Sequence, residues 1–502
     1  MRHGKAQTWL AMILMGWTLF ACASLPEVDP DKTKANAKPV PVVQAAGGKL
    51  PAQTTEALLQ KRWAKSTLDL KAQAALEESA TGVPLIAGNK VQLLFDGPQT
   101  LTEMAKAIAA AKNNINFETY IFDQDELGEK FADLLIKKQR EGVVVNVIVD
   151  AVGTIAVPGE FFKRMRDGGV QVLVYNPVNP AKTRGNGWKV NNRDHRKMLI
   201  VDGRVGFAGG INISDTYAKS WPFRSKGRRA SGSGSTGGSS PLGSGAGGSV
   251  IGSGGGIGSG LGGGTPGAPK DPKEEGWRDT HVRIEGPAVQ AMQWLFIQHW
   301  VRQDADDLRD AVYFPTPQVA GDKVVRILGS EPDGKFEIYK ALLLAIQESK
   351  KSIHITCAYF VPDEQTLQAL IDAAQRGVDV QLVLPSVSDA ALVFHAGRAF
   401  YSRLLKAGVR IHELKKSVLH AKTAVIDGVW STVGSTNLDT RSFLHNAEMN
   451  VIVMGDAFGQ EMENAFKEDL RISTEITRQS WDDRPISVKL KEFLARLWDY
   501  WL

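Results

Sequence analysis

The sequence predicts an α/β protein built from two tandem copies of one unit, with mostly parallel sheets. Residues 115–151 run from an apolar strand through an amphipathic helix and a glycine to a second apolar strand, and residues 353–385 repeat that order. Nearly continuous hydrophobic strands that alternate with helices indicate βαβ units whose sheets are covered on both faces.

The composition fits such a fold and limits the chemistry. The chain has 502 residues, 43% hydrophobic composition and a formal net charge of +5, which is enough for two or three soluble domains. This charge suits an acidic substrate, and dedicated nucleic-acid binding is not expected. With only two cysteines, Cys22 and Cys357, the chain offers neither a disulfide scaffold nor a zinc cluster.

The N-terminus is typical of an exported protein. Residues 1–22 have a basic start and an apolar run that is short for a membrane span. Leu19–Cys22 resembles a bacterial lipobox, which makes Cys22 a candidate lipidation site; an uncleaved anchor is the alternative. Residues 23–85 follow as a tether and an N-terminal helical segment. We therefore expect a membrane-anchored lipoprotein of the bacterial cell envelope that faces the periplasm.

An insertion interrupts the first copy at about residues 223–275. Between Ala230 and Gly267 the chain is nearly all Gly and Ser, which cannot bury enough apolar surface to offset backbone entropy. We expect a disordered insertion, and no GK[ST] follows to make it a phosphate loop. The domain limits become 86–310 for the first copy and 311–487 for the second.

Each copy contains the same motif. Residues 194–212 read DHRKMLIVDGRVGFAGGIN and residues 419–437 read LHAKTAVIDGVWSTVGSTN, so H-x-K-x-x-x-x-D-G occurs twice with equal trailing spacing. On a strand, His195 and Lys197 point to one face and Met198 to the other. Two cations on one surface require an anion between them. Two accidental matches of this length are improbable.

These motifs resemble those of the phospholipase D superfamily, and the flanking segments are similar to its bacterial cardiolipin synthase branch. The flanks include NFETYIF, WRDTHVRIEGPAV, ITCAYFVPDE and GSTNLDTRSFLHNAEMNV, and the likeness covers roughly Val91 to Arg478 outside the insertion. The resemblance implies two phospholipase D-like α/β/α domains packed about a pseudo-two-fold axis, with one shared active site.

The residue types explain a phosphodiester exchange without a metal or another cofactor. Histidine can attack phosphorus and exchange protons near neutral pH. We favour His195 as the nucleophile that forms a phosphohistidine and His420 as the acid and base; the reverse assignment stays open. Candidate ligands of the phosphate oxygens are Lys197, Lys422, Asn212, Asn437 and Ser435.

Four carboxylates have supporting candidate roles. Asp202 and Asp427 each precede a glycine at a predicted hairpin, which fits a turn, whereas the resemblance implies that they help to fix the histidines and the domain junction. Glu118 and Glu448 are candidates to orient the imidazoles through Nδ1, or are buried structural carboxylates.

Three features favour a phospholipid substrate: the predicted lipid anchor, the lack of aromatic-basic stretches typical of strand-binding grooves, and the flanks that resemble a cardiolipin synthase. A cardiolipin synthase moves a phosphatidyl group from one phosphatidylglycerol to another and releases glycerol, so the expected partners are anionic phospholipid and a membrane surface. An exported phospholipase D or nuclease that uses water is the alternative. Residues 488–502 predict an amphipathic helix whose apolar face either docks on the domain or lies on a bilayer. The oligomeric state stays open.

Overall fold

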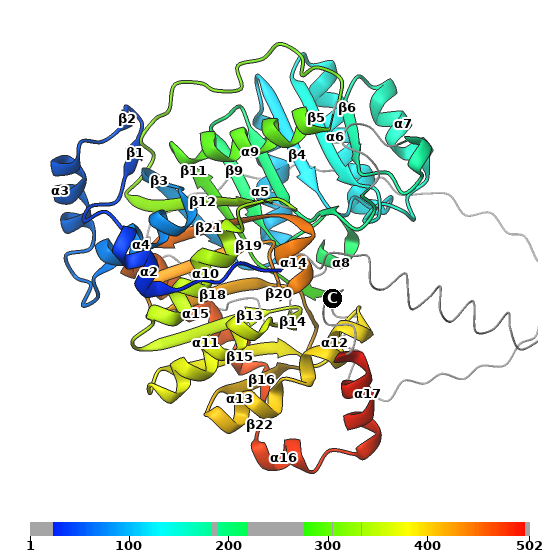
Figure 1. Ribbon diagram of the computed structural model, residues 1–502. Coiled ribbons are helices and arrows are strands. Elements are labelled where there is room, and N and C mark those ends of the chain that lie inside the picture. The colour runs from blue at the N-terminus through cyan, green and yellow to red at the C-terminus, as the bar shows by residue number, and fades with distance from the viewer. Residues whose placement is uncertain (1–23, 183–188, 219–275, 304, 333, 497–502) are drawn as a thin grey trace, which may run out of the picture.

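The computed structural model describes residues 24–182, 189–218, 276–303, 305–332 and 334–496 (Figure 1). The predicted signal peptide with Cys22 and the predicted Gly/Ser insertion lie outside these residues. Among the helices of the described residues, none combines the length and the apolar character that a membrane crossing needs.

The first copy is an α/β unit with a seven-strand sheet in the order β6-β5-β4-β8-β9-β11-β3. In chain order its elements are β3 (Leu85–Leu94), α5 (Gly97–Ala110), β4 (Asn114–Thr119), α6 (Glu126–Arg140), β5 (Val144–Asp150), α7 (Gly159–Asp167), β6 (Gln171–Tyr175), β7 (Arg193–Asp194), β8 (Lys197–Val201), β9 (Val205–Gly209), α8 (Asp215–Ala218), β10 (Trp277–Arg278), β11 (His281–Glu285) and α9 (Ala288–Arg302).

The second copy repeats this order as β16-β15-β13-β18-β19-β21-β12. Its elements are β12 (Lys323–Ser330), α10 (Glu337–Glu348), β13 (Ser352–Cys357), β14 (Phe360–Val361), α11 (Glu364–Gln375), β15 (Asp379–Pro385), α12 (Ala391–Arg398), α13 (Tyr401–Ala407), β16 (Arg410–Leu414), β17 (Val418–Leu419), β18 (Lys422–Ile426), β19 (Trp430–Gly434), β20 (Leu438–Asp439), α14 (Thr440–Leu444), β21 (Asn446–Met454), α15 (Asp456–Arg471), β22 (Ser473–Ile476), α16 (Arg478–Asp482) and α17 (Ile486–Arg496).

The predicted α/β class and its duplication are confirmed. In each copy the βαβ units give three parallel strands, and the motif hairpin adds antiparallel strands beside them. The two connections from helix to strand are alike. Gly142 (φ +89°) follows α6 and Gly377 (φ +88°) follows α11, and both adopt a left-handed conformation that glycine accepts without steric cost.

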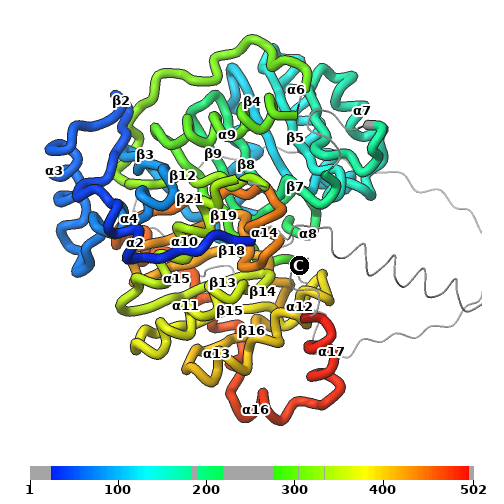
Figure 2. The backbone as a smooth tube through the Cα atoms, viewed as in Figure 1, coloured from blue at the N-terminus to red at the C-terminus, as the bar shows by residue number. Residues whose placement is uncertain are grey.

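The two sheets are joined along β3 and pack face to face. Lys90 to Leu94 pair with β11 of the first copy, whereas Ile86 to Asn89 pair with β12 of the second. One buried cluster contains side chains from both sheets, among them Met198, Ile200, Val282, Val325, Val425 and Val451. The copies therefore share a core, and Figure 2 shows the two halves of the chain next to each other.

The N-terminal segment differs from the predicted tether. From residue 24 on, it packs on the second copy through α2 (Pro30–Asn36), β1 (Val43–Ala45), β2 (Gly48–Lys49), α3 (Ala52–Arg62) and α4 (Leu70–Thr81). Asp29 caps α2 by accepting the N–H groups of Asp31 and Lys32, and Val28 and Val43 are buried. The helix cap and the two buried valines order this segment, although its polar composition suggested a tether.

Of the two alternatives for the predicted C-terminal helix, α17 does not show an apolar face docked on the domain; residues 497–502 lie outside the described residues. Glu492 and Ala495 are its buried side chains, and Glu492 accepts hydrogen bonds from Arg398 and Arg484. Leu490 and Phe493 are exposed by 56% and 62%. The ionic contact of Glu492 and the buried Ala495 hold the described part of this helix, and its large apolar side chains point away from the domain.

Candidate active site

The two motifs form matching β-hairpins, β8–β9 and β18–β19. Strand alternation sends Met198 and Ile200 into the core between the sheets, while Leu199 and Val201 face the helices of the first copy. His195 and Lys197 lie at the start of this strand and are on the same face as Leu199, as the spacing predicts. The second motif is placed in the same way by β18.

Each motif histidine is carried by one copy and held by the other. The N–H of His195 donates to the carbonyl of Ala447 at 2.9 Å, where β7 pairs with β21. The N–H of His420 donates to the carbonyl of Arg278 at 2.8 Å, where β17 pairs with β10. This reciprocal exchange brings both histidines to one place at the junction of the sheets.

Each imidazole contacts a carboxylate from the opposite copy. Nδ1 of His195 lies 2.9 Å from Oε1 of Glu448, and Nδ1 of His420 lies 2.7 Å from Oδ2 of Asp279. A carboxylate on Nδ1 fixes the tautomer and leaves Nε2 for chemistry. The structure thus places Glu448 where an orienting carboxylate was predicted.

Asp279 is the residue that sequence reasoning missed. His281 pairs with Gly209 of the first motif, and Asn450 pairs with the equivalent Gly434 of the second. Asp279 lies two residues before His281 and Glu448 two residues before Asn450, so the two carboxylates occupy equivalent positions. Aligning WRDTH with NAEMN between the two copies was the signal that could have found it.

A small residue lies beside each of these carboxylates: Gly210 beside Asp279 and Ser435 beside Glu448. Gly210 faces Asp279, and a Cβ at this position would collide with the carboxylate. In the second copy Ser435 stands at that place and its hydroxyl donates to Glu448. Ser435, predicted as a phosphate ligand, therefore holds the longer carboxylate.

Both motif lysines are buried in the site. Nζ of Lys197 donates to the carbonyl of His195 at 2.6 Å and lies 5.2 Å from the ring centre of Tyr120. Lys422 donates likewise to the carbonyl of His420 and lies 5.8 Å from the ring centre of Tyr359. Two ammonium groups therefore flank the imidazoles from matching positions.

The charges differ between the two sides. Burial and the charges of Lys197, Lys422 and His420 lower the pKa of His195 well below its usual value. Burial and Lys422 also lower the pKa of His420, and the charge of Asp279 opposes part of this decrease. His195 is thus held neutral, and His420 has a counter-ion for its protonated form.

The neighbouring ionisable groups respond to the same burial. Burial raises the pKa of Glu448 to about 7 and lowers the pKa of Lys197 to about 7. Although burial opposes it, the charges of His420 and Lys422 hold the pKa of Asp279 below its usual value. Asp279 is therefore the carboxylate that stays ionised. An anionic phosphate would restore the charge on the lysines.

The two predicted asparagines occupy equivalent places. The side-chain oxygen of Asn212 accepts the N–H of Ile121 at 3.0 Å, and that of Asn437 accepts the N–H of Tyr359 at 3.3 Å. The amide nitrogen of Asn212 donates to the hydroxyl of Tyr217, which lies 3.2 Å from Nδ1 of His420. Asn212 thus reaches the second histidine through a tyrosine.

Asp202 and Asp427 lie away from the histidines, at the far ends of β8 and β18. Both adopt left-handed backbone, with φ +53° and φ +55°. The carboxylate of Asp202 accepts the N–H groups of residues 112–114, and that of Asp427 accepts those of residues 350–352. A five-residue strand spans roughly 17 Å, so these aspartates fix turns and not imidazoles.

Glu118 is placed against a different histidine from the one predicted. Thr119 faces Asn212, so alternation turns Glu118 to the other side of β4, where its Oε1 lies 2.7 Å from Nδ1 of His299. Asp194 lies beside this pair, and the ligand atoms of Glu118, Asp194 and His299 lie within 4.8 Å of one another, as they would around a metal ion. The guanidinium of Arg196, 3.7 Å from Glu118, supplies positive charge there, so the group is a salt-bridge cluster.

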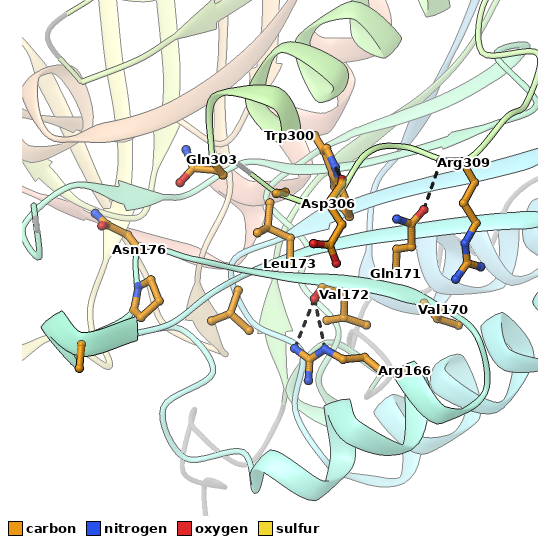
Figure 3. A pocket seen from close by; sticks show the side chains of 14 residues that line it. Arg166, Val170, Gln171, Val172, Leu173, Asn176, Trp300, Gln303, Asp306 and Arg309 are labelled. Atoms are coloured by element: carbon orange, nitrogen blue, oxygen red, sulfur yellow. Dashed lines mark hydrogen bonds between the residues drawn. The ribbon is translucent and has the colours of Figure 1, made fainter. Parts of the chain in front are cut away.

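A cavity of 720 Å³ lies elsewhere, between β6 and the end of α9 (Figure 3). Its lining includes Arg166, Gln171, Asn176, Trp300 and Arg309 and none of the motif residues. The histidine site is therefore recognised from its chemistry and not from the size of a cavity.

Comparisons with known proteins agree with this geometry. A family model described as cardiolipin synthase, PLD-like domain, matches residues 104–220 and 342–470. The chain is 32% identical over 417 residues to a cardiolipin synthase of Geobacillus thermodenitrificans, covering 82% of this chain and 72% of that protein.

One further relative and one solved structure extend the comparison. The major cardiolipin synthase of Bacillus subtilis strain 168 is 32% identical over 412 residues, covering 82% of this chain and 74% of that protein. The fold is similar to that of a phosphatidylserine synthase from Haemophilus influenzae, with a TM-score of 0.57 at 13% identity over 85% of this chain and 99% of that one. The chain belongs to the cardiolipin synthase branch of the phospholipase D superfamily and is a phosphatidyltransferase of that family.

Proposed function

We propose that the chain transfers a phosphatidyl group from one phosphatidylglycerol to another, forming cardiolipin and releasing glycerol through a phosphohistidine. The named activity of its relatives supports this substrate. The observation that carries the mechanism is the pair of histidines from two copies, each with its own carboxylate from the opposite copy.

In the first step, Nε2 of neutral His195 attacks the phosphorus, and the bond from phosphorus to the glycerol oxygen breaks. Glu448 accepts the Nδ1–H hydrogen bond of His195 and stabilises the positive charge that develops on the ring. His420 donates its Nε2 proton to the departing oxygen, so free glycerol leaves. Asp279 balances the charge of His420 before the step.

In the second step, neutral His420 accepts the hydroxyl proton of a second phosphatidylglycerol. The oxygen attacks the phosphorus, the bond to His195 breaks, and both histidines return to their starting states. Lys197 and Lys422, which lie beside the two histidines, stabilise the charge on the non-bridging oxygens in both transition states. One phosphodiester replaces another, so the cycle consumes no nucleotide.

The location is a further part of the proposal. The lipobox-like Leu19–Cys22 supports acylation of Cys22 and attachment to the bacterial cell envelope on its periplasmic side. Labelling cells with a tagged fatty acid should mark the wild-type protein, and Cys22→Ala should remove the label. A labelled Cys22→Ala protein would contradict this anchor.

Product analysis tests the activity. Purified protein incubated with vesicles of phosphatidylglycerol should yield equal amounts of cardiolipin and glycerol. If water is the acceptor, as in an exported phospholipase D, phosphatidic acid and glycerol form in the absence of cardiolipin, and transfer is overturned. A nuclease would instead cleave a nucleic acid and leave the lipid unchanged.

A further inference from the structure

Exposed apolar side chains gather on one side of α17. Ile486, Leu490, Phe493 and Leu494 are exposed by 82%, 56%, 62% and 51%. Their spacing of four, three and one residues places them on one face of a helix. The surface of a soluble protein rarely has so many large apolar side chains close together.

The opposite face of α17 is the one that docks on the protein. Ala495 is buried, and the carboxylate of Glu492 lies 3.3 Å from Nε of Arg398 in α12 and 2.9 Å from Nη2 of Arg484. Figures 1 and 2 show α17 alongside α12. The helix is thus held from behind, and its apolar face points outward.

Basic residues border the apolar face. By helical position, Lys489 and Arg496 fall on one flank and Lys491 on the other, and all three are exposed. The only acidic residue of α17, Glu492, lies on the buried side. An apolar strip between basic flanks is the pattern of a helix that lies in the interface of an anionic bilayer.

Helix α12, which packs against α17, connects this region to the active site. Leu392, in α12, is exposed by 44%. Three residues before it, Asp389 accepts the hydroxyl of Tyr359 at 2.7 Å. The ring of Tyr359 lies 6.2 Å from that of His420. A short path of residues therefore joins the exposed helix to the catalytic histidine.

We propose that the outer face of α17, with Leu392 of α12, is a docking surface for an anionic phospholipid bilayer that seats the active site at the lipid interface. The inference rests on the proposed function, since a lipid substrate must be drawn from a membrane. It adds a second membrane contact, distinct from the proposed anchor at Cys22.

Site-specific fluorescence tests the surface in the full chain. In a Cys22→Ser background, Phe493→Cys carries an environment-sensitive fluorophore, and Cys357 is only 2% exposed and stays unlabelled. Vesicles of phosphatidylglycerol should shift the emission to the blue, and vesicles of phosphatidylcholine should shift it less. The matched control is Trp294→Cys on α9, which is exposed by 53% and should not respond.

Turnover gives a second reading. Leu490→Glu with Phe493→Glu should lower turnover of vesicle phosphatidylglycerol by about tenfold or more, and leave turnover of a water-soluble short-chain phosphodiester unchanged. Emission at residue 493 that ignores vesicles, or an equal response at residue 294, overturns the proposal. A blue shift that depends on protein concentration without vesicles shows that a second copy covers the face and also overturns it. Because fluorescence needs no catalysis, failure of the proposed activity is read separately.

Discussion

At the residue scale, the two histidines are equivalent in position and unequal in charge. His420 faces Asp279, whose pKa is lowered, whereas His195 faces Glu448, whose pKa burial raises to about 7. A carboxylate that stays ionised stabilises a protonated imidazole more than one that takes up a proton. This difference supports His420 as the acid and base and His195 as the nucleophile.

Removing Asp279 should affect proton transfer more than attack. With a soluble p-nitrophenyl phosphodiester, the leaving group needs no acid, so Asp279→Asn should release a burst of p-nitrophenol equal to the enzyme and then turn over about 10²- to 10⁴-fold more slowly. Glu448→Gln should slow the burst itself. Stopped-flow absorbance measures both, and the opposite pattern would reverse the roles.

Lys197 should set the alkaline limit of the free enzyme. Its pKa is lowered to about 7, and only the protonated ammonium binds the phosphate. With the p-nitrophenyl phosphodiester, whose leaving group needs no acid from His420, kcat/KM should therefore fall as pH rises through about 7. Bound anion raises this pKa, so the limit in kcat should lie higher. Lys197→Arg should abolish the fall in kcat/KM. If the fall persists in this variant, another group is responsible.

The same scale shows what sequence could predict. Two identical spacings predicted that His195 and His420 act with Lys197 and Lys422, because a period of two fixes which side chains share a face. Asp279 could not be found from spacing near His420, since 141 residues separate them and strand exchange between the copies brings them together. Glu118 was misplaced because alternation, and not residue type, decides which histidine it meets.

At the element scale, each motif hairpin depends on its aspartate. Asp202→Ala removes the acceptor of three N–H groups and leaves alanine in left-handed backbone, which should cost about 2–4 kcal/mol. We expect a lower midpoint in thermal unfolding, with turnover of the folded protein little changed at a temperature well below it. Asp202→Asn, which tolerates this backbone, should lose less. Unchanged stability with lost turnover would return Asp202 to the chemistry.

Elements at the ends of the chain were predicted less well than those of the core. Apolar strands and amphipathic helices have periods that sequence alone displays. For α17 the helical period of the apolar residues was evident in the sequence. Which face is exposed depends on the hydrogen bonds from Arg398 and Arg484 to Glu492, and both arginines lie outside α17. For residues 24–45, contacts with the second copy order a segment whose composition resembles a tether.

At the scale of the whole molecule, the active site exists only where the copies meet. β3 joins both sheets, and each copy lends a strand edge to the histidine of the other. The cores of both copies must therefore form before the active site does. The shared site was predicted from the resemblance of the two motifs to a known family, and no single segment of the sequence would have predicted it.

The predicted Gly/Ser insertion provides a test at this scale. The Gly/Ser composition of Ala230–Gly267 predicts a disordered insertion. Deleting it should leave turnover of phosphatidylglycerol within about twofold, since the length of a flexible loop has a small effect on folding energetics. A folded deletion variant without activity would assign this segment a role in the reaction.

The most direct measurement of the central claim is to locate the covalent intermediate. His420→Asn should attack the p-nitrophenyl donor through His195 and then stall, because no base activates the acceptor. Mass spectrometry of the quenched protein should find the phosphoryl adduct on the peptide that contains His195. An adduct on residue 420 in the reciprocal variant His195→Asn, or full turnover by either variant, would contradict one phosphate shared by two unequal histidines.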